Sequence, residues 1–318
     1  MADYDTYGGN FMLPHPYAVK NVTGYGVALD GTYDTIQKFV DSRLNCGGHD
    51  PQYHLVSSTV LFTFMRMGCM ECSGHPQDGS FSEKELNITL LLLAVKGSEM
   101  RLVWYMPYLW LDSGPALIAG RDIYGFPKQM AKVEIPQLGG SAELKVSAEV
   151  LHRHDGLPGV EKEILSVKRK PGGVIEKESD ATNVADALVI LLKSVFKVGK
   201  FVPAPLSTLS TLGLAVPVIN PGELKMVWMR QLPSIWNFKK ACFRSVAEAP
   251  FTVTLRGAGL LKGDYEVSIP WHHSAHLVDE LGIGTAGSDL ITTAKAAYHM
   301  DLDFILDKGE DLWVEHEK

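Results

Sequence analysis

Residues 120–128 read Gly-Arg-Asp-Ile-Tyr-Gly-Phe-Pro-Lys and place a single lysine directly behind an aromatic residue and a proline. A lysine attacks a carbonyl group only as the neutral amine, and an apolar environment favours that form because burial penalises the ammonium ion. Phe126, Pro127 and Met130 supply apolar neighbours on both sides of Lys128. Because proline fixes its own φ and biases Phe126 toward extended geometry, the lysine leaves a stiff backbone. Lys128 is therefore the candidate nucleophile.

A second informative stretch lies upstream, where residues 81–88 read Phe-Ser-Glu-Lys-Glu-Leu-Asn-Ile. Together the two stretches resemble the acetoacetate decarboxylase superfamily, whose members carry a Gly-Arg-Glu-x-x-Gly-Phe-Pro-Lys-type segment and an aromatic-x-Glu-x-x-Leu-x-Ile pattern. Asp122 stands where the family usually has glutamate. Residues 111–116 and 241–250 add further similarity, so that the resemblance covers roughly residues 20–283.

The resemblance implies a catalytic role for two side chains. In the superfamily the lysine of this segment forms a Schiff base with a keto substrate, and Lys128 occupies its position. Glu83 stands at the position of a pocket carboxylate, which implies that it moves protons during imine formation and steadies the iminium charge. The resemblance implies no metal or organic cofactor, because the protonated imine is itself the electron sink.

Four neighbours of the lysine are the candidate substrate-binding residues: Arg121, Tyr124, Phe126 and Gln129. If residues 123–128 are extended, Tyr124, Phe126 and Lys128 share one face, which puts the tyrosine ring beside the lysine. Ordinary core packing explains Tyr124 equally well, and pairing with a neighbouring acid or carbonyl explains Arg121.

Two departures from the family pattern concern positive charge. Many decarboxylases of the family have a second lysine directly after the nucleophile, whereas this chain has Gln129. Acetoacetate decarboxylase is a known example of a lysine activated by desolvation or by a cationic neighbour, so desolvation is the means expected here. The family also uses an N-terminal arginine for the substrate carboxylate. The first arginine here, Arg43, follows Tyr33, Ile36 and Val40 at helical spacing, which indicates a solvated helix residue.

The composition fits a soluble enzyme but selects no activity. The chain has 318 residues, of which 46% are hydrophobic, and a formal net charge of -7, which argues against nucleic-acid binding. The basic cluster at residues 168–170 adjoins Pro-Gly-Gly, which is typical of an exposed turn. The first residues are acidic, unlike a secretory signal, and no apolar run approaches the ~18 residues of a membrane span. We therefore expect a cytoplasmic protein with no membrane partner.

Two groups of residues have some features of a metal site. Cys69, Cys72 and His75 have the spacing of zinc ligands, but the chain has no second Cys-x-x-Cys. Its four cysteines are better interpreted as isolated thiols in a reducing compartment. Residues 271–276 read Trp-His-His-Ser-Ala-His and lack a clear carboxylate ligand, so they are expected at a strand-to-loop edge near the pocket. No metal site is predicted.

Strands outnumber helices in the hydrophobic pattern. Alternation, or enrichment in β-branched and aromatic residues, predicts strands at residues 55–67, 86–95, 102–106, 144–151, 225–229, 251–256 and 265–269. Residues 257–259 are expected to form the turn between the last two, and the unbroken run of residues 90–93 indicates burial on both faces. Helical spacing predicts the clearest helix at residues 182–200.

These elements predict a single α+β domain over residues 1–318, built on a large, mostly antiparallel β-sheet. The resemblance implies that the sheet forms a barrel-like or cone-shaped core around Lys128 with helices outside, and that the protein is a homo-oligomer. Residues 284–318 lie beyond the matched segment and are expected to form a C-terminal extension, docked on the core or on a neighbouring subunit.

Three functions are compatible with these residues. The lead is a carbon–carbon lyase that decarboxylates a β-keto acid through a lysine imine and enamine. The second is a lysine-dependent aldolase, dehydratase or carbon–carbon bond-forming enzyme on a keto acid or ketone, which the missing second lysine and arginine favour. The third is a non-catalytic small-molecule binding protein. This function does not explain why the chain has both Lys128 and Glu83. Release of carbon dioxide and consumption of an aldehyde discriminate the first two.

Overall fold

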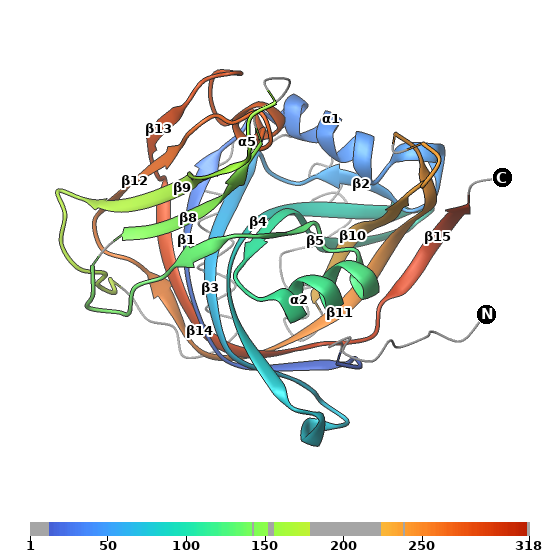
Figure 1. Ribbon diagram of the computed structural model, residues 1–318, viewed down its shortest axis with the longest axis horizontal. Helices are drawn as coiled ribbons and strands as arrows, with labels where there is room; N and C mark the ends of the chain where they lie inside the picture. Colours follow the sequence, from blue (N-terminus) through green and yellow to red (C-terminus); the bar gives the residue numbers. More distant parts are fainter. Residues whose placement is uncertain (1–12, 142, 152–155, 179–223, 238, 317–318) are drawn as a thin grey trace.

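The larger of two β-sheets carries the candidate lysine. The computed structural model describes residues 13–141, 143–151, 156–178, 224–237 and 239–316 (Figure 1). Within them the larger sheet comprises β1 (Tyr17–Asp30), β2 (Gln52–Leu55), β3 (Thr59–Cys72), β4 (Ser80–Lys96), β5 (Glu99–Leu111), β6 (Lys128–Met130), β10 (Leu224–Pro233), β11 (Ala241–Leu260), β14 (Ala296–Leu306) and β15 (Glu310–His316). The helix predicted at residues 182–200 lies outside the described residues.

The strand order closes this sheet into a ring. Neighbouring strands follow the order β2-β4-β3-β1-β14-β11-β10-β5-β6, and β4 also pairs with β5, so that the path closes one strand in from each end. The pairs β5–β10 and β5–β6 are parallel and the other pairs are antiparallel. The prediction of a large, mostly antiparallel sheet with a barrel-like core is confirmed.

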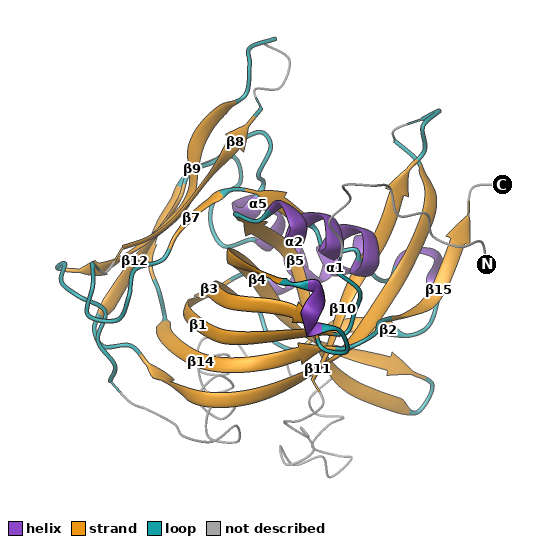
Figure 2. Ribbon diagram, turned by 60° about the horizontal axis from the view of Figure 1, so that its bottom comes forward, coloured by secondary structure: helices purple, strands orange, loops and turns teal. Residues whose placement is uncertain are grey.

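A smaller sheet and a few short helices surround the ring. The second sheet has the order β13-β12-β9-β8-β7 and stands beside the ring (Figure 2). Its strands are β7 (Lys132–Glu134), β8 (Glu143–Val150), β9 (Val160–Lys170), β12 (Asp264–Ile269) and β13 (Leu290–Thr293). The described helices are α1 (Tyr33–Arg43), α2 (Gly114–Ala119) and α5 (Leu277–Leu281), with the single turns η1 (Cys46–Gly48), η2 (Pro76–Asp78) and η3 (Gly120–Tyr124).

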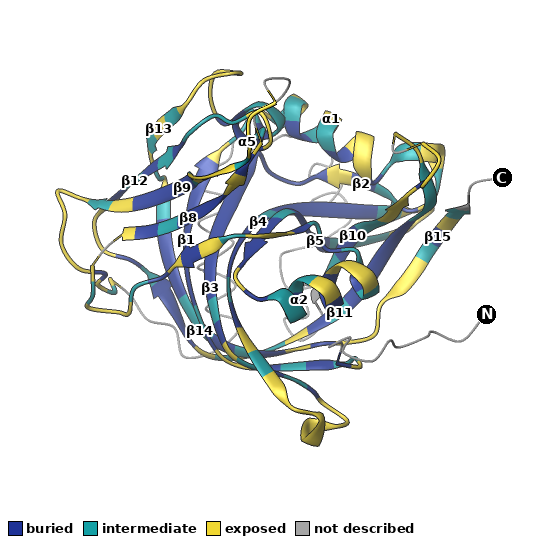
Figure 3. Cartoon of the chain, viewed as in Figure 1, coloured by how far each residue is buried: buried dark blue, intermediate teal, exposed yellow. Residues whose placement is uncertain are grey.

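Burial explains why these segments adopt their places. The continuous run Leu90 to Leu93 on β4 is buried on both faces, as expected for a strand covered on each side. The predicted helical spacing near Arg43 is confirmed as α1, whose Ile36 and Val40 are fully buried while its outer face is exposed (Figure 3). The largest apolar cluster fills the space between the ring, α1, α5 and the second sheet, and another lies inside the ring.

One expectation about the C-terminal part was wrong. Residues 257–259 do not form a turn but lie within the long strand β11, and the chain reverses instead near Gly263, where φ is +94°. Within the C-terminal residues 284–318, residues 296–306 form β14, which lies in the larger sheet and pairs with β1 on one side and β11 on the other. None of the helices in the described part of the chain is long and apolar enough to span a membrane.

Candidate active site

A cavity of about 210 Å³ lies inside the ring. Side chains from β1, β3, β4, β5, β10, β11 and β14 line it, together with α2 and the segment that leads to β6. In Figure 1, α2 lies across the ring. Most of the lining is apolar, and six of the chain's eleven methionines contribute to it: Met65, Met67, Met70, Met106, Met226 and Met300.

The turn after α2 places Lys128 in this cavity. The helix ends in a wide π turn over residues 120–124, and Gly125 in the left-handed region (φ +78°) reverses the backbone so that the Phe126 N–H donates to the Gly120 carbonyl. Strand β6 then begins at Lys128, which pairs with Leu109 of β5. The lysine side chain runs over Gly120, where an added Cβ would lie 2.7 Å from its Cδ and Cε. Glycine at position 120 therefore makes room for the nucleophile.

The amine of Lys128 faces a buried carboxyl group. Its Nζ lies 3.6 Å from Oε2 of Glu83, just beyond hydrogen-bond length, and 5.2 Å from the centre of the Phe126 ring. Lys128 is 5% exposed and Glu83 is 3% exposed, and Oε2 of Glu83 has no hydrogen-bond partner. Burial raises the pKa of Glu83 despite the opposing charge of Lys128. Because its pKa is raised, the Glu83 carboxyl group can hold the proton that the Lys128 amine must lose before it attacks a carbonyl.

A second buried carboxyl group lies beside this pair and was missed in the sequence. Glu85 is 4% exposed, and its Oε1 accepts a 2.9 Å hydrogen bond from Nδ2 of Asn87. The Thr89 hydroxyl in turn donates to the Asn87 side-chain oxygen at 3.1 Å. Burial, reinforced by the negative charge of Glu83, raises the pKa of Glu85 to about 7. Glu85 is therefore suited to donate and accept protons near neutral pH.

The signal for this polar stripe was present in the sequence. Glu83, Glu85, Asn87 and Thr89 alternate along β4, and all four line the cavity, because side chains two positions apart point to the same face of a strand. The predicted strand began only at residue 86, so the alternation of the preceding polar positions went unused. The strand actually begins at Ser80.

The other predicted site residues divide into two groups. Tyr124 and Phe126 line the cavity with Lys128, although the extended geometry considered for residues 123–128 does not hold throughout, because residues 123 and 124 belong to a π turn. The Tyr124 hydroxyl is engaged, because it donates a 2.9 Å hydrogen bond to the Asp307 carbonyl. Arg121 and Gln129 are exposed and do not line the cavity, and Nη1 of Arg121 instead donates to the Lys128 carbonyl at 3.4 Å.

Positive charge is scarce around the candidate nucleophile. Within the described part of the chain, Lys128 is the only lysine or arginine that lines the cavity. Arg43 belongs to α1 and lies near Glu280 of α5, away from the cavity. Among the described residues, a substrate carboxylate would therefore meet no lysine or arginine other than Lys128.

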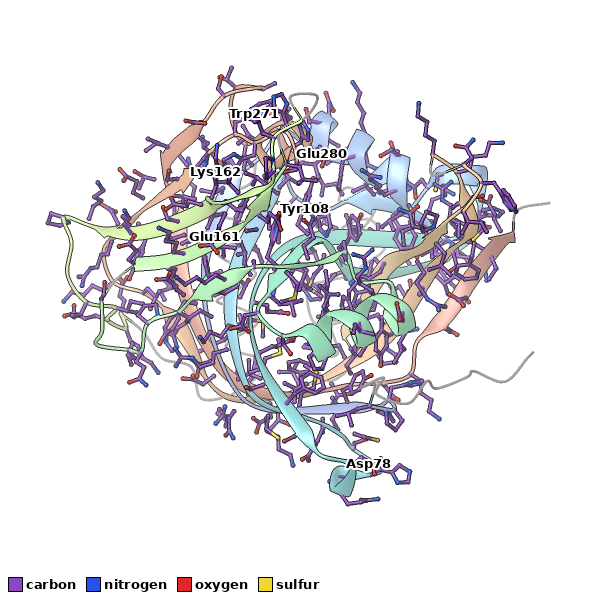
Figure 4. All side chains as sticks on the ribbon, in the orientation of Figure 1. Asp78, Tyr108, Glu161, Lys162, Trp271 and Glu280 are labelled. Carbon is purple, nitrogen blue, oxygen red and sulfur yellow. The ribbon has the colours of Figure 1, made fainter. Side chains whose placement is uncertain are left out.

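Neither group considered as a metal site lines the cavity. All four cysteines are free, and the described residues contain no group of three or more His, Cys, Asp or Glu side chains arranged to hold a metal ion. The segment 271–276 follows β12, at a strand-to-loop edge as expected, but outside the cavity lining. Trp271 donates from Nε1 to Asp279 and lies close to α5 and β13, as Figure 4 shows.

The part of the chain that contains Glu83 and Lys128 is similar to a known protein family. The family model described as acetoacetate decarboxylase (ADC) matches residues 9–165, which include Glu83 and Lys128. This part of the chain, just under half of its length, is therefore similar to the acetoacetate decarboxylase family. The resemblance seen in the two sequence motifs is confirmed, although no curated protein matches the chain significantly.

Solved structures extend the relationship in fold to nearly the whole chain. The acetoacetate decarboxylase from Legionella pneumophila is 15% identical, with a TM-score of 0.58 and 98% of each chain covered. An acetoacetate decarboxylase-like enzyme from Sphingomonas wittichii RW1 is 10% identical, with a TM-score of 0.54 and 94% of each chain covered. The enduracididine biosynthesis enzyme MppR complexed with pyruvate is 12% identical, with a TM-score of 0.52 over 94% of this chain and 91% of that one. At these identities the structures establish the acetoacetate decarboxylase-like fold and not the substrate.

Proposed function

We propose that this protein is a Schiff-base-forming lyase that decarboxylates a β-keto acid, with Lys128 as the nucleophile. The observation that carries the proposal is the buried Lys128 amine, 3.6 Å from the unpartnered carboxyl oxygen of Glu83, inside an apolar cavity. A structural ion pair needs no cavity beside it. An amine that attacks a carbonyl needs both the space and a nearby group that exchanges protons.

Imine formation uses the raised pKa of Glu83. When the carboxyl group holds a proton, the neutral Lys128 amine attacks the ketone and gives a carbinolamine. Glu83 then protonates the leaving hydroxyl group, water departs, and the positive iminium forms beside the carboxylate of Glu83. The opposite charges stabilise each other, because the surrounding methionines and aromatic rings offer little screening.

The small number of charged side chains around the iminium also favours the next step, the loss of carbon dioxide. The bond between the α carbon and the carboxylate breaks, and its electron pair moves toward the iminium nitrogen to give a neutral enamine. An apolar cavity favours this step, because two opposite charges on the bound substrate disappear together. Glu85 is the proposed donor of the proton that the enamine carbon takes up, since its pKa of about 7 suits it to this transfer. Hydrolysis of the resulting imine releases the ketone and the free lysine.

A carbon–carbon bond-forming reaction is the second candidate. The specific observation that favours it is the lack of any lysine or arginine other than Lys128 among the described residues that line the cavity. An enzyme of the same fold, MppR, is known in complex with the condensation product of pyruvate and imidazole 4-carboxaldehyde. Here the enamine would attack an aldehyde carbon instead of taking up a proton, and the lysine would be regenerated by the same hydrolysis.

The two reactions are separated by measuring what leaves and what is consumed. Purified protein is incubated with acetoacetate, 3-oxooctanoate or pyruvate, with and without benzaldehyde, and carbon dioxide and aldehyde are quantified. Decarboxylation predicts carbon dioxide from a β-keto acid without aldehyde, and its loss in Lys128→Gln but not in Lys132→Gln, whose side chain is 64% exposed. Aldehyde consumption without carbon dioxide would replace the first candidate by the second.

A further inference from the structure

The cavity is too large for the smallest β-keto acids. One water molecule needs about 10–15 Å³ of such space, so a cavity of about 210 Å³ has room for roughly fifteen water-sized groups. Acetoacetate has only seven non-hydrogen atoms. A small keto acid would leave half of the volume to water, which contacts few polar partners on a wall of methionine, leucine and aromatic side chains.

The strand register shows where the unused space lies. Val253 on β11 is opposite Phe304 on β14, Phe304 is opposite Val19 on β1, and Val19 is opposite Met70 on β3. These four residues therefore form one continuous row across four adjacent strands, and all four line the cavity. We call Val19, Met70, Val253 and Phe304 the apolar row. A β-bulge at Asn21 (φ +57°) shifts the register after Val19.

The reactive groups lie one row further along. Val22, Met67 and Glu83 follow the apolar row on β1, β3 and β4, and Gly24, Met65 and Glu85 come next. The next row is polar, because the Thr63 and Tyr298 hydroxyls are 2.7 Å apart in a hydrogen bond and Asn87 lies opposite Thr63. Leu61 and Thr89 line the cavity beyond this polar row. The reactive groups thus lie between the polar row and the apolar row.

We infer that the substrate carries a hydrocarbon tail of roughly six to ten carbons, which lies along the apolar row while the keto group meets Lys128. This inference rests on the proposed Schiff-base function. The tail excludes water from the cavity, and the carbonyl end of the substrate lies against Glu83 and Glu85. The substrate class is therefore a medium-chain β-keto acid, and its product is a medium-chain methyl ketone.

Trapping of product ketones tests the tail directly. Intact mass is measured after borohydride reduction with acetone and with 2-nonanone, which differ by six methylene groups, and the half-saturating concentrations are compared. Each buried methylene strengthens binding by up to about four-fold, so 2-nonanone is expected to saturate at a concentration at least 100-fold lower. Equal or weaker trapping of 2-nonanone would overturn the inference while leaving the Schiff base intact. Absence of any adduct with either ketone would overturn the proposed function and the inference with it.

Variants on β11 test the position of the tail. Val253→Trp fills the apolar row and is expected to reduce the preference for 2-nonanone over acetone at least tenfold, and a cooperative thermal transition shows that the variant is folded. The matched control is Thr254→Trp, since Thr254 is the next residue along the strand and is exposed on the opposite face. If Val253→Trp does not fold, Val253→Phe makes the same test with a smaller ring. Unchanged preference for 2-nonanone in a folded variant would overturn the assignment of the tail to the apolar row.

Discussion

At the scale of single residues, the proposed chemistry depends on two carboxyl groups that are buried beside one amine. The sequence identified Lys128 and Glu83 through two motifs, because covalent chemistry restricts the residue types that can serve. It did not identify Glu85, whose importance comes from its burial and from Asn87 and Glu83 as neighbours. It also suggested Arg121 and Gln129, which are close to the lysine in sequence but point away from the cavity.

Replacement of Glu83 by glutamine tests its role in proton transfer. The amide keeps the size of the side chain but cannot protonate the leaving hydroxyl group, so imine formation is expected to slow by about 10²–10⁴-fold. The rate is measured by rapid mixing with a ketone followed by borohydride at timed intervals. Glu134→Gln is the control, because Glu134 belongs to an exposed pair with Lys132 at 3.4 Å. A rate for Glu83→Gln within a few-fold of the unaltered protein would show that Glu83 has no such role.

Glu85 makes folding stability depend on pH. The pKa of Glu85 is raised from 4.5 to about 7 in the folded protein. Between pH 4.5 and pH 7, the folded state therefore holds a proton that the unfolded state has released. Stability from this group is therefore fully present below about pH 4.5 and is lost as the pH rises through 7, by about 3 kcal/mol in total. Glu85→Gln removes the titration, so the variant is expected to gain stability relative to the unaltered protein between pH 5 and pH 8. Denaturant unfolding at both values measures the change, and a constant difference would contradict the assigned pKa.

At the scale of elements, the turn after α2 brings Lys128 into the cavity and so allows its amine to reach a substrate. Sequence patterns predicted α1 and the strands β3, β4, β5, β8, β10, β11 and β12, because alternation and helical spacing report burial directly, but they did not predict β1, β9 or β14. The π turn at residues 120–124 was not predicted, since its geometry follows from packing against the ring and not from a local sequence period. A turn was wrongly predicted at residues 257–259, which lie inside β11, because glycines within a long strand resemble the end of a strand in the sequence.

Gly120→Ala tests the placement of the lysine by this turn. Gly120 has ordinary helical dihedral angles (φ -66°, ψ -42°), so alanine does not strain the backbone, but its Cβ would displace the Lys128 side chain. We expect imine formation to fall by about tenfold or more with little loss of thermal stability, because a small misplacement of a reactive group is costly. Gly114→Ala is the matched control, since a Cβ at Gly114 meets no atom within 4 Å. Equal rates in the two variants would show that Gly120 does not position the amine.

At the scale of the whole molecule, the ring is assembled from both ends of the chain. The barrel-like sheet was predicted from the family resemblance, whereas composition and periodicity gave only a large antiparallel sheet. The strands β14 and β15 were not predicted, because the motifs ended before them and because strand pairing is decided by contacts distant in sequence. Strand β14 supplies Phe304 and Tyr298 to the cavity as well as closing the ring between β1 and β11.

Removal of β14 distinguishes an integral strand from an extension. A chain ending at residue 295 lacks β14 together with β15, which leaves the β14-facing edges of β1 and β11 unpaired and the cavity open, so we expect it to lose cooperative thermal unfolding and ketone trapping together. Circular dichroism on heating measures the first and intact mass the second. A cooperative transition with retained trapping would mean that β14 is dispensable to the ring.

The central claim is that the Lys128 amine forms an imine with a ketone inside the ring. The most direct measurement is borohydride reduction with 2-nonanone, followed by intact mass and peptide mapping of the modified residue. We expect one adduct per chain, located on Lys128, abolished in Lys128→Gln and unchanged in Lys132→Gln. An adduct distributed over exposed lysines, or one that persists in Lys128→Gln, would contradict the account.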